Sequence, residues 1–549
     1  MLKKTLTGIL FTAFMMPVMA QFGAMKLPKI TSPVFKKDTL SIKKFGSVPD
    51  GKILNTAPIQ EAINWLSAKG GGVVLVPAGL WLTGPLVLRS NINLHLAIGA
   101  TLLFTKDFNQ YPLVEGNWEG SPQIRNQSPI SANKATNIAI TGRGIIDGNG
   151  DAWRMVKKDK LNETQWKKLV SSGGLLSEDK KTWYPSQSSF DGSKLQNPGV
   201  ISPEKTPEYY NKVKDFLRPN MVVLNECNKI LLEGVTFQNS PAWCLHPLLC
   251  ENLTVRNIIV KNPWYAQNGD GIDAESCRNV LIENSIFDVG DDALCMKSGR
   301  DEAGRKRGRA IENVIIRGCT VYAAHGGFVI GSEMSGGAKN IFVSNCSFIG
   351  TDIGLRFKTT RGRGGVVENI FISGIYMKEI VGEAILFDMY YMAKDPIPLE
   401  GEKRELPKVE FKPVDESTPV FRNFVISDVY CNGAAKGIFI RGIPEMHVKD
   451  IVLKDMVLQA KVGMDIQEAS NISFTNIQLV TPGTEPMIDI VQSDKLEFSR
   501  ITWPVSLPTA YRVSGERSKE IKIHFSRKSD LIDNIKQELG AVNAVEIIR

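Results

Sequence analysis

The sequence predicts an all-β protein, a right-handed parallel β-helix whose N-terminal end is capped by one amphipathic helix. One observation is a nine-residue pattern of alternating apolar residues that recurs along most of the 549-residue chain. Another is the abundance of short Val- and Ile-rich runs separated by Gly and Asn. The 43% hydrophobic and 23% charged residues are typical of a globular protein rather than a disordered one. The short Val- and Ile-rich runs, with no helix-favouring low-complexity segment, rule out a helical bundle and a coiled coil.

Each copy of the pattern has Asn or Asp first, then alternating apolar residues, a break of two residues and a second short apolar run. The copies begin at Asn252, Asn279, Asn313, Asn340, Asn369, Asn423, Asp450 and Asn471, with looser ones at Lys229 and Lys495. Each repeat contains two short strands and no helix, a pattern that differs from leucine-rich repeats and from propeller blades. A β-sandwich with accidental regularity is the alternative.

Stacked coils place equivalent positions of the pattern in one column. The column that we predict contains Val235, Ile258, Ser285, Cys319, Cys346, Ile375, Val429, Met456 and Ile477. The eight cysteines fall largely within such strand-like runs, so we expect them to pack as small buried hydrophobes, with at most one or two disulfide bridges.

The region before the repeats contains the predicted capping helix, residues 56–69. Ile59, Ala62, Ile63 and Leu66 share one face of it, Asn55 or Thr56 caps it and Gly70 ends it. Strands are expected at residues 73–76 and within 86–103.

Residues 1–20 are predicted to be a secretory signal peptide, with Lys3 and Lys4 before a short apolar stretch. The stretch is too short for a membrane anchor, so we expect a periplasmic or secreted protein that does not insert into a membrane. Residues 21–549 then form one parallel β-helix domain with insertions at about 105–135, 150–218 and 396–421. The insertion 150–218 is too long for a plain turn and is expected to be a functional loop or a lid.

Aspartates cluster where the repeats are most regular. Asp270 and Asp291 are 21 residues apart, about one coil, which places both carboxylates on one face of adjacent coils. Asp291 and Asp292 are neighbours and can share a site only if Gly290 bends the chain or a strand ends there. Asp273 and Asp288 are interpreted as structural.

Later coils add complementary groups to the same predicted groove. His325 lies in the next coil, and Arg356 and Lys358, two residues apart, share one side of a strand a further coil along. Three carboxylates, an imidazole and two cations suit the hydrolysis of a glycoside of an acidic sugar.

At these residues the chain resembles glycoside hydrolase family 28, the polygalacturonases. The four family motifs occur in order as NGD at 268–270, GDD at 290–292, HG at 325–326 and RFK at 356–358. Gly replaces the usual Thr in the first motif and Phe the usual Ile in the last, which keeps the charged groups. The resemblance extends from about residue 40 to about residue 500.

The resemblance implies a role for each matching residue. Asp291 corresponds to the general acid, and Asp270 and Asp292 to the pair that activates water, which gives inversion. His325 corresponds to the residue that tunes the acid, and Asn268 to a substrate contact. Arg356 and Lys358 would hold the uronate carboxylate. No cofactor or metal is implied, and we expect an acidic polysaccharide as partner of a monomer.

Three groups have a plainer interpretation beside the functional one. Arg361 and Arg363 either extend the anionic subsite or are solvated. The basic run 300–309 is most simply a solvated loop, here at the rim of the groove. Nucleic-acid binding would need a basic surface across the whole fold, which a net charge of +8 does not supply.

The insertions resemble those of the exo-acting, plant-like branch, which implies release of terminal galacturonic acid from homogalacturonan or pectic oligosaccharides. A rhamnogalacturonan-directed hydrolase of the same family is the alternative. A pectate lyase, which needs Ca²⁺ and an arginine base, and a non-catalytic carbohydrate-binding β-helix are the hypotheses from other classes.

Overall fold

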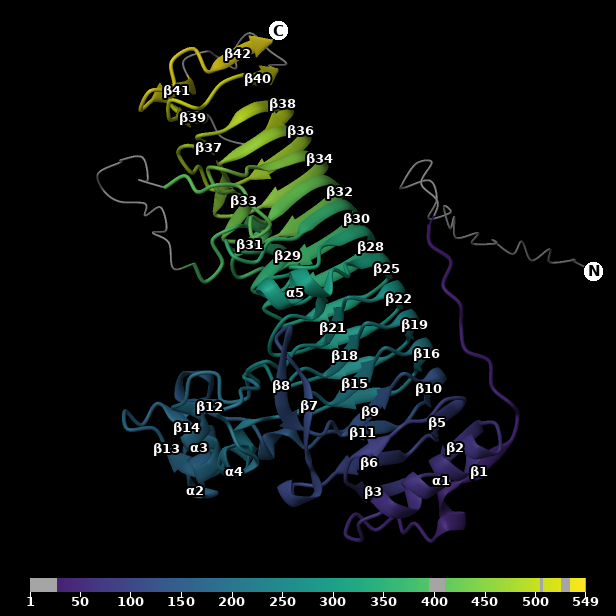
Figure 1. Cartoon of the computed structure of the whole chain (residues 1–549). Coiled ribbons are helices and arrows are strands. Elements are labelled where there is room, and N and C mark those ends of the chain that lie inside the picture. Colours follow the sequence, from purple (N-terminus) through teal and green to yellow (C-terminus); the bar gives the residue numbers. More distant parts are fainter. Residues whose placement is uncertain (1–26, 394–409, 504–506, 525–533, 549) are drawn as a thin grey trace, which may run out of the picture.

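The protein is a long stack of β-strand coils, seen from the side in Figure 1. The computed structural model describes residues 27–393, 410–503, 507–524 and 534–548. A 23-stranded sheet A extends from β1 (Thr39–Ser41) to β42 (Val545–Ile548), and a 14-stranded sheet B extends from β4 (Leu86–Val87) to β41 (Ile535–Glu538). Every neighbouring pair in the core of the stack is parallel, so the predicted all-β parallel β-helix is confirmed.

Sheet A supplies two faces of each coil. In the first half of the stack the two faces are separate strands, such as β22 (Arg278–Glu283) and β23 (Ile286–Asp288). In the second half one bent strand runs through both faces, such as β30 (Val366–Lys378) and β32 (Val420–Asn432).

Sheet B is the third face and carries the candidate site. Its strands between the ends are β9 (Ile130–Asn133), β15 (Val222–Asn225), β18 (Leu245–Leu248), β21 (Ile272–Glu275), β24 (Leu294–Lys297), β27 (Gly326–Ile330), β29 (Ile353–Lys358), β31 (Glu383–Asp388), β33 (Lys436–Arg441), β35 (Val462–Gln467), β37 (Ile488–Val491) and β39 (Tyr511–Ser514).

The predicted column of buried residues is confirmed by the strand register. Cys346 pairs with Ile375, Ile375 with Val429, and Met456 with Ile477. All nine members are at most 2% exposed. Pairing of like positions in successive coils builds one hydrophobic core that runs from Leu40 to Ala544.

The Asn or Asp that begins each repeat has a backbone reason. All ten first residues of the pattern have a positive φ between 53° and 59°, the left-handed region that Asn and Asp tolerate better than other side chains. Their amides also stack, because Asn313 donates to Asn279 at 3.2 Å and Asn340 donates to Asn313 at 3.3 Å. This asparagine ladder fixes the bend between sheet B and sheet A in successive coils.

The predicted capping helix is α1 (Thr56–Ala68), and its buried residues are the four expected ones. Asn55 is the N-cap residue, but its side chain binds the loop at Val48 and Ile53 rather than the helix. The strand expected at 73–76 is β2 (Gly72–Val76). The stretch 86–103 contains three strands, β4, β5 (Ile92–Leu96) and β6 (Ala100–Phe104), because each coil turns twice within it.

All eight cysteines belong to the described part of the chain and are free and buried, which confirms their interpretation as small core residues. The predicted signal peptide, residues 1–20, lies outside the described residues, as does most of the insertion at 396–421. Within the described ranges, no helix has the length and apolar character needed to cross a membrane.

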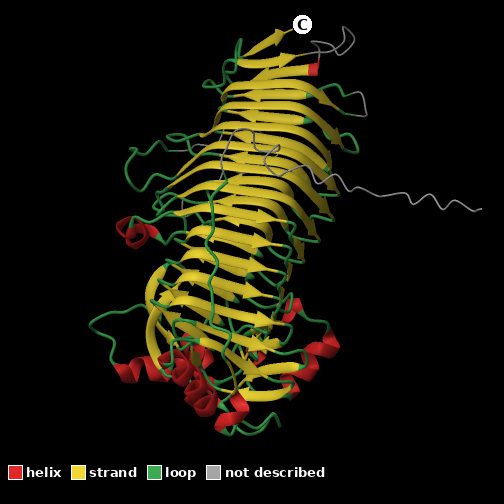
Figure 2. Cartoon of the chain, turned by 90° about the vertical axis from the view of Figure 1, so that its right-hand side faces the viewer, coloured by secondary structure: helices red, strands yellow, loops and turns green. Residues whose placement is uncertain are grey.

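Two insertions form structures of their own between sheet A and sheet B. The first contains the hairpin of β7 (Leu113–Trp118) and β8 (Ser121–Asn126). The second is a small module with the sheet β12 (Val156–Lys157), β14 (Thr182–Tyr184) and β13 (Leu175–Leu176) and the helices α2 (Glu163–Ser171), α3 (Gln187–Ser193) and α4 (Pro207–Lys212). The helices of this module and α1 lie at the N-terminal end of the stack, whereas α5 (Asp301–Arg307) lies about halfway along it, as Figures 1 and 2 show.

Candidate active site

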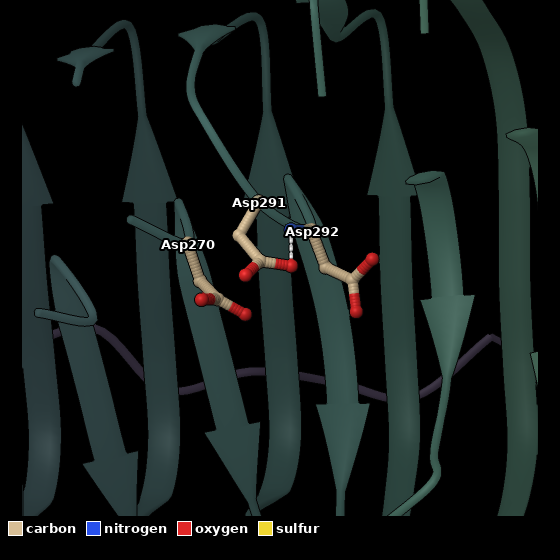
Figure 3. A group of neighbouring side chains, drawn as sticks. All are labelled: Asp270, Asp291 and Asp292. Carbon is tan, nitrogen blue, oxygen red and sulfur yellow. Dashed lines mark hydrogen bonds between the residues drawn. The ribbon is translucent and has the colours of Figure 1, made fainter. Parts of the chain in front are cut away.

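The three predicted carboxylates meet in the turns that enter sheet B. Asp270 precedes β21, and Asp291 and Asp292 occupy the turn before β24, the next strand of the sheet. Asp291 and Asp292 therefore avoid the opposite directions that a regular strand would impose. One carboxylate oxygen of each residue lies within 4.8 Å of the others, and Figure 3 shows the three side chains converging.

Asp292 is held by two cations on β29, two strands further along sheet B. Arg356 Nη1 lies 3.1 Å from Asp292 Oδ1, and Lys358 Nζ lies 2.7 Å from Oδ2. Burial opposes the ionisation of Asp292, but Lys358, Arg356 and the nearby Lys297 outweigh it and hold its pKa well below the usual range. Asp292 is thus a carboxylate with both oxygens engaged.

Asp291 is the accessible member of the group, with its side chain 23% exposed. It accepts hydrogen bonds from the backbone N–H groups of Asn268 at 3.2 Å and Asp292 at 3.1 Å, and His325 Nδ1 lies 3.0 Å from its Oδ1. The hydrogen bond to Asp291, opposed by partial burial, raises the pKa of His325. The imidazolium form is therefore favoured beside this carboxylate.

Asn268 contacts the site mainly through its backbone. Its side-chain oxygen accepts from Arg218 Nη2 at 3.0 Å, and Arg218 also donates to the carbonyls of Pro241 and Gln267. Arg218 is a buried clamp on the loop that leads to Asp270. Nothing in the repeat pattern marks Arg218, because it belongs to the end of the second insertion.

A second buried ion network lies beside the carboxylates. Lys297, on β24, contacts Glu333 Oε2 at 2.8 Å and Asp273 Oδ1 at 3.6 Å. Asp273 is fully buried and, apart from this ion pair, its oxygens have no hydrogen-bond partner among the described residues. Burial and the neighbouring carboxylates, chiefly Asp273, raise the pKa of Asp270, whereas Lys297 lowers it.

The repeat pattern does not mark this network. The sequence favours a structural role for Asp273, whereas the register places it in one column of sheet B with Cys295, Val329 and Arg356, facing the groove. Lys297 follows GDD by five residues, and its spacing of two from Cys295 could have placed it on the same face. Glu333 lies in a loop after β27, where the sequence carries no periodic signal.

Arg361 and Arg363 are neither solvated nor free. Arg361 makes a two-pronged contact with Glu445, at 2.6 Å from each guanidinium nitrogen. Arg363 is buried and contacts Asp301, Ser332 and Glu333. In this structure both guanidinium groups brace the loop after β29, and their predicted contact with substrate stays a prediction.

The basic run 300–309 forms the short helix α5 (Asp301–Arg307) on the rim where the chain leaves sheet B. Its arginines are paired: Arg305 donates to the carbonyl of Gly362 at 2.6 Å, Arg307 contacts Glu275 and Arg309 lies 3.0 Å from Glu251. The expected position at the rim agrees with this structure, but a solvated loop does not.

The tip of the β7–β8 hairpin reaches the loop that follows β24. At its tip Glu119 lies 3.2 Å from Arg300 Nη1, and the backbone N–H of Arg300 donates to the carbonyl of Gly120. Beneath the tip, Trp118 stacks on Trp243 with ring centres 6.1 Å apart. The hairpin tip is thereby held against the loop that follows β24.

Asp270, Asp291 and Asp292 are the group in the described ranges whose oxygens are close enough to share a metal ion. Arg356 and Lys358 already bind both oxygens of Asp292. The donor set is therefore better suited to proton transfer than to a divalent cation, which prefers several free carboxylate oxygens.

Comparison with known proteins agrees with this geometry. Residues 210–427, which include all four motifs, match the model for Glycosyl hydrolases family 28. The chain is 31% identical over 348 residues to a probable polygalacturonase of Vitis vinifera, covering 62% of this chain and 60% of that one. It is 28% identical over 366 residues to an exo-poly-alpha-D-galacturonosidase of Dickeya chrysanthemi, covering 64% and 57%.

The alignments thus span 60% or less of the length of these two curated relatives. Among solved structures, a hyperthermoactive exopolygalacturonase from Thermotoga maritima superposes with a TM-score of 0.65 at 29% identity. That superposition covers 87% of this chain and 94% of the Thermotoga chain.

Proposed function

The chain belongs to glycoside hydrolase family 28 through residues 210–427, and on this premise we propose that it hydrolyses α-1,4-galacturonosidic linkages of pectin. The observation that carries the proposal is the group of three carboxylates, of which Asp292 is bound by Arg356 and Lys358. This hydrolysis requires a general acid, a carboxylate that activates water, and cations that bind the carboxylate of the uronic acid.

The acid is Asp291. It is the carboxylate that substrate can reach, whereas Asp270 and Asp292 are 3% and 2% exposed. Protonated Asp291 donates its proton to the glycosidic oxygen as the bond to the anomeric carbon breaks. His325 then faces the carboxylate that remains, and its cationic form stabilises the new negative charge.

Asp270 and Asp292 orient the attacking water and accept its proton. Asp292 is unsuited to direct attack on the sugar, because each of its oxygens is held by a cation. We therefore infer inversion of the anomeric configuration. The nearest oxygens of the three carboxylates lie within 4.8 Å of one another, nearer to the roughly 5–5.5 Å of retaining enzymes than to the roughly 6.5–9.5 Å of inverting ones. Inversion is therefore inferred from the two cations that hold Asp292.

We further propose exo attack, with release of one terminal sugar at a time. Support comes from the β7–β8 hairpin, whose tip reaches Arg300. We infer that the hairpin closes one end of the groove. A closed end admits a chain terminus and excludes the middle of a polymer. The exo-acting relatives from Dickeya chrysanthemi and Thermotoga maritima favour the same mode.

We also infer export to the periplasm or the medium, on the basis of the signal-like residues 1–20. Pectin is a polymer of the plant cell wall and is met outside the cell. Amino-terminal sequencing of the secreted protein would give the processing site, and a cytoplasmic, unprocessed chain would contradict the proposal.

The test is product analysis on polygalacturonate with the wild type, Asp291→Asn and the control Asp288→Asn. We expect monomeric galacturonate from the wild type and the control, and a loss of about 10²–10⁴-fold in kcat for Asp291→Asn. A ladder of oligomers contradicts exo attack, an unsaturated product indicates a lyase, and activity on rhamnogalacturonan alone favours the other substrate.

A further inference from the structure

Several arginines on the β-helix are paired with carboxylates of the neighbouring coil. Arg317 lies 2.6 Å from Glu283, Arg422 lies 2.7 Å from Glu368 and Arg512 lies 2.5 Å from Asp489. Each such cross-strand pair neutralises one positive charge on the stack. The inserted module of residues 150–218 carries lysines outside such pairs.

Four lysines gather on one part of the module. Lys157, Lys158 and Lys181 line one open hollow together with Asp159 and Glu163, and Lys160 belongs to the same short helical turn as Lys158. Lys158 lies 3.4 Å from Glu163, and the charge of Lys181 acts on Asp179. No ion pair within 4.0 Å involves Lys157 or Lys160 among the described residues, so these two ammonium groups are the ones most available to an anionic partner.

An exposed tryptophan adjoins this charge. Trp264 is 50% exposed, and Lys160 Nζ lies 5.5 Å from the centre of its ring. Of the nine tryptophans, all of them in described ranges, only Trp264 and Trp65 are more than a third exposed. A flat aromatic ring beside an ammonium group suits an acidic sugar, whose C–H face packs on the ring and whose carboxylate meets the cation.

Trp264 belongs to the loop that leads into Asn268 and Asp270. The loop packs on the GDD motif so closely that a side chain at Gly290 would meet the carbonyl oxygen of Pro263 at 2.4 Å. On its other side the loop joins the module, because Tyr265 packs against the module core of Val156, Trp166 and Trp183. The tryptophan thus lies where the module meets the catalytic loop.

We propose that Trp264, Lys160 and the lysines of the adjoining hollow form a second binding site for polygalacturonate, outside the pocket that holds the scissile bond. This inference rests on the proposed function. A polymer bound at two places gains affinity through a high effective concentration at the catalytic pocket, whereas a disaccharide fills the pocket alone.

The test compares long and short substrates. The triple variant Lys157→Gln/Lys160→Gln/Lys181→Gln and the single variant Trp264→Ala are assayed on polygalacturonate and on digalacturonate. We expect KM for the polymer to rise roughly tenfold in the triple variant, because it loses three exposed charge contacts, each of which contributes little alone. KM for the dimer and kcat for both substrates stay unchanged.

The chain offers a matched control at its capped end. Trp65 on α1 is 47% exposed and has Lys69 Nζ 5.7 Å from its ring centre, so it repeats the Trp264–Lys160 arrangement far from the site. Trp65→Ala and Lys43→Gln/Lys44→Gln/Lys69→Gln remove the same aromatic ring and the same charge. These controls are expected to leave KM for both substrates unchanged, and thermal unfolding checks that every variant is folded.

Direct binding separates this inference from the proposed function. Polygalacturonate binding is measured in the non-hydrolysing Asp291→Asn background, with and without the triple substitution. Loss of polymer binding supports the second site even if the wild type fails to hydrolyse polygalacturonate, a result that would defeat the proposed function alone. The inference would be overturned if the substitutions changed KM equally for polymer and dimer, or if the control variants changed it as much. It would also be overturned if the protein bound phosphatidylglycerol vesicles more tightly than polygalacturonate.

Discussion

Asp292 depends on its two cations for the charge that the proposed mechanism uses. Lys358 Nζ lies 2.7 Å from one of its oxygens and contributes most among the groups that lower its pKa against burial. Lys358→Met should therefore raise the pKa of Asp292, so that the acid limb of the pH profile of kcat/KM moves to higher pH. Lys339→Met, at an exposed lysine paired with Glu312 on sheet A, is the control and should leave the profile in place.

The Lys297–Glu333 ion pair should make the free energy of unfolding depend on pH. Burial would raise the pKa of Glu333, but Lys297 outweighs it and lowers the pKa to about 2 from the ordinary 4.5. A lowered folded-state pKa contributes stability above the unfolded value and loses it as the pH falls through the folded value. Glu333→Gln should thus cost about 3 kcal/mol at pH 7, a cost that shrinks between pH 4.5 and 2.

Denaturant unfolding of the wild type and Glu333→Gln at several pH values checks this. The double variant Lys297→Met/Glu333→Gln removes both charges and should recover part of the loss, because a single buried cation is left in Glu333→Gln. A constant difference from pH 7 to pH 2 would contradict the assigned pairing.

Among the elements, the β7–β8 hairpin should decide the mode of attack. A side chain at Gly120, where φ is +78°, would meet the backbone N of Arg300 at 2.7 Å. Gly120→Val should lift the hairpin tip and open the groove, so that viscosity of a polygalacturonate solution falls faster per bond cleaved. Gly116→Ala is the control on the same hairpin, since its added carbon meets nothing closer than 3.9 Å.

The asparagine ladder sets the bend of each coil. Asn313 has φ of +58°, donates to Asn279 and accepts from Asn340. Asn313→Ala should lower the free energy of unfolding by about 1–3 kcal/mol, through left-handed backbone strain and two lost hydrogen bonds. Asn313→Gly relieves the strain only and should cost less. Denaturant unfolding of the wild type and the two variants gives their free energies of unfolding. An equal loss of stability in both variants would rule out backbone strain as a cause.

The elements also show which features the sequence could predict. The column through Cys319 and the groove of Asp270, Asp291, His325 and Arg356 follow from the repeat, because a coil puts equal positions in register. The hairpin contact with Arg300 and the position of Glu333 could not be predicted, because insertions are aperiodic and their docking depends on tertiary contacts. The buried position of Lys297 could not be predicted, because a single lysine at the end of a strand is usually a surface residue.

The whole molecule is held together without disulfides. All eight cysteines, each within a described range, are buried in the stack as free thiols. Reductant should therefore leave the unfolding temperature unchanged, and a thiol assay should count eight groups in denaturant and none in the native protein. A drop in the unfolding temperature with reductant, or fewer than eight thiols, would contradict this arrangement.

The site draws Asp270, Asp292, His325 and Lys358 from four consecutive coils. Its groups are therefore spaced in steps of one strand separation, about 4.8 Å. Duplication of a coil beyond Lys358 would lengthen the groove by one strand separation and leave the spacing of the catalytic residues unchanged. Duplication of a coil between Asp270 and Lys358 would instead separate the carboxylates from Lys358. The groove can therefore be lengthened by whole coils at one end, whereas the proposed catalytic centre needs its four coils in unbroken succession.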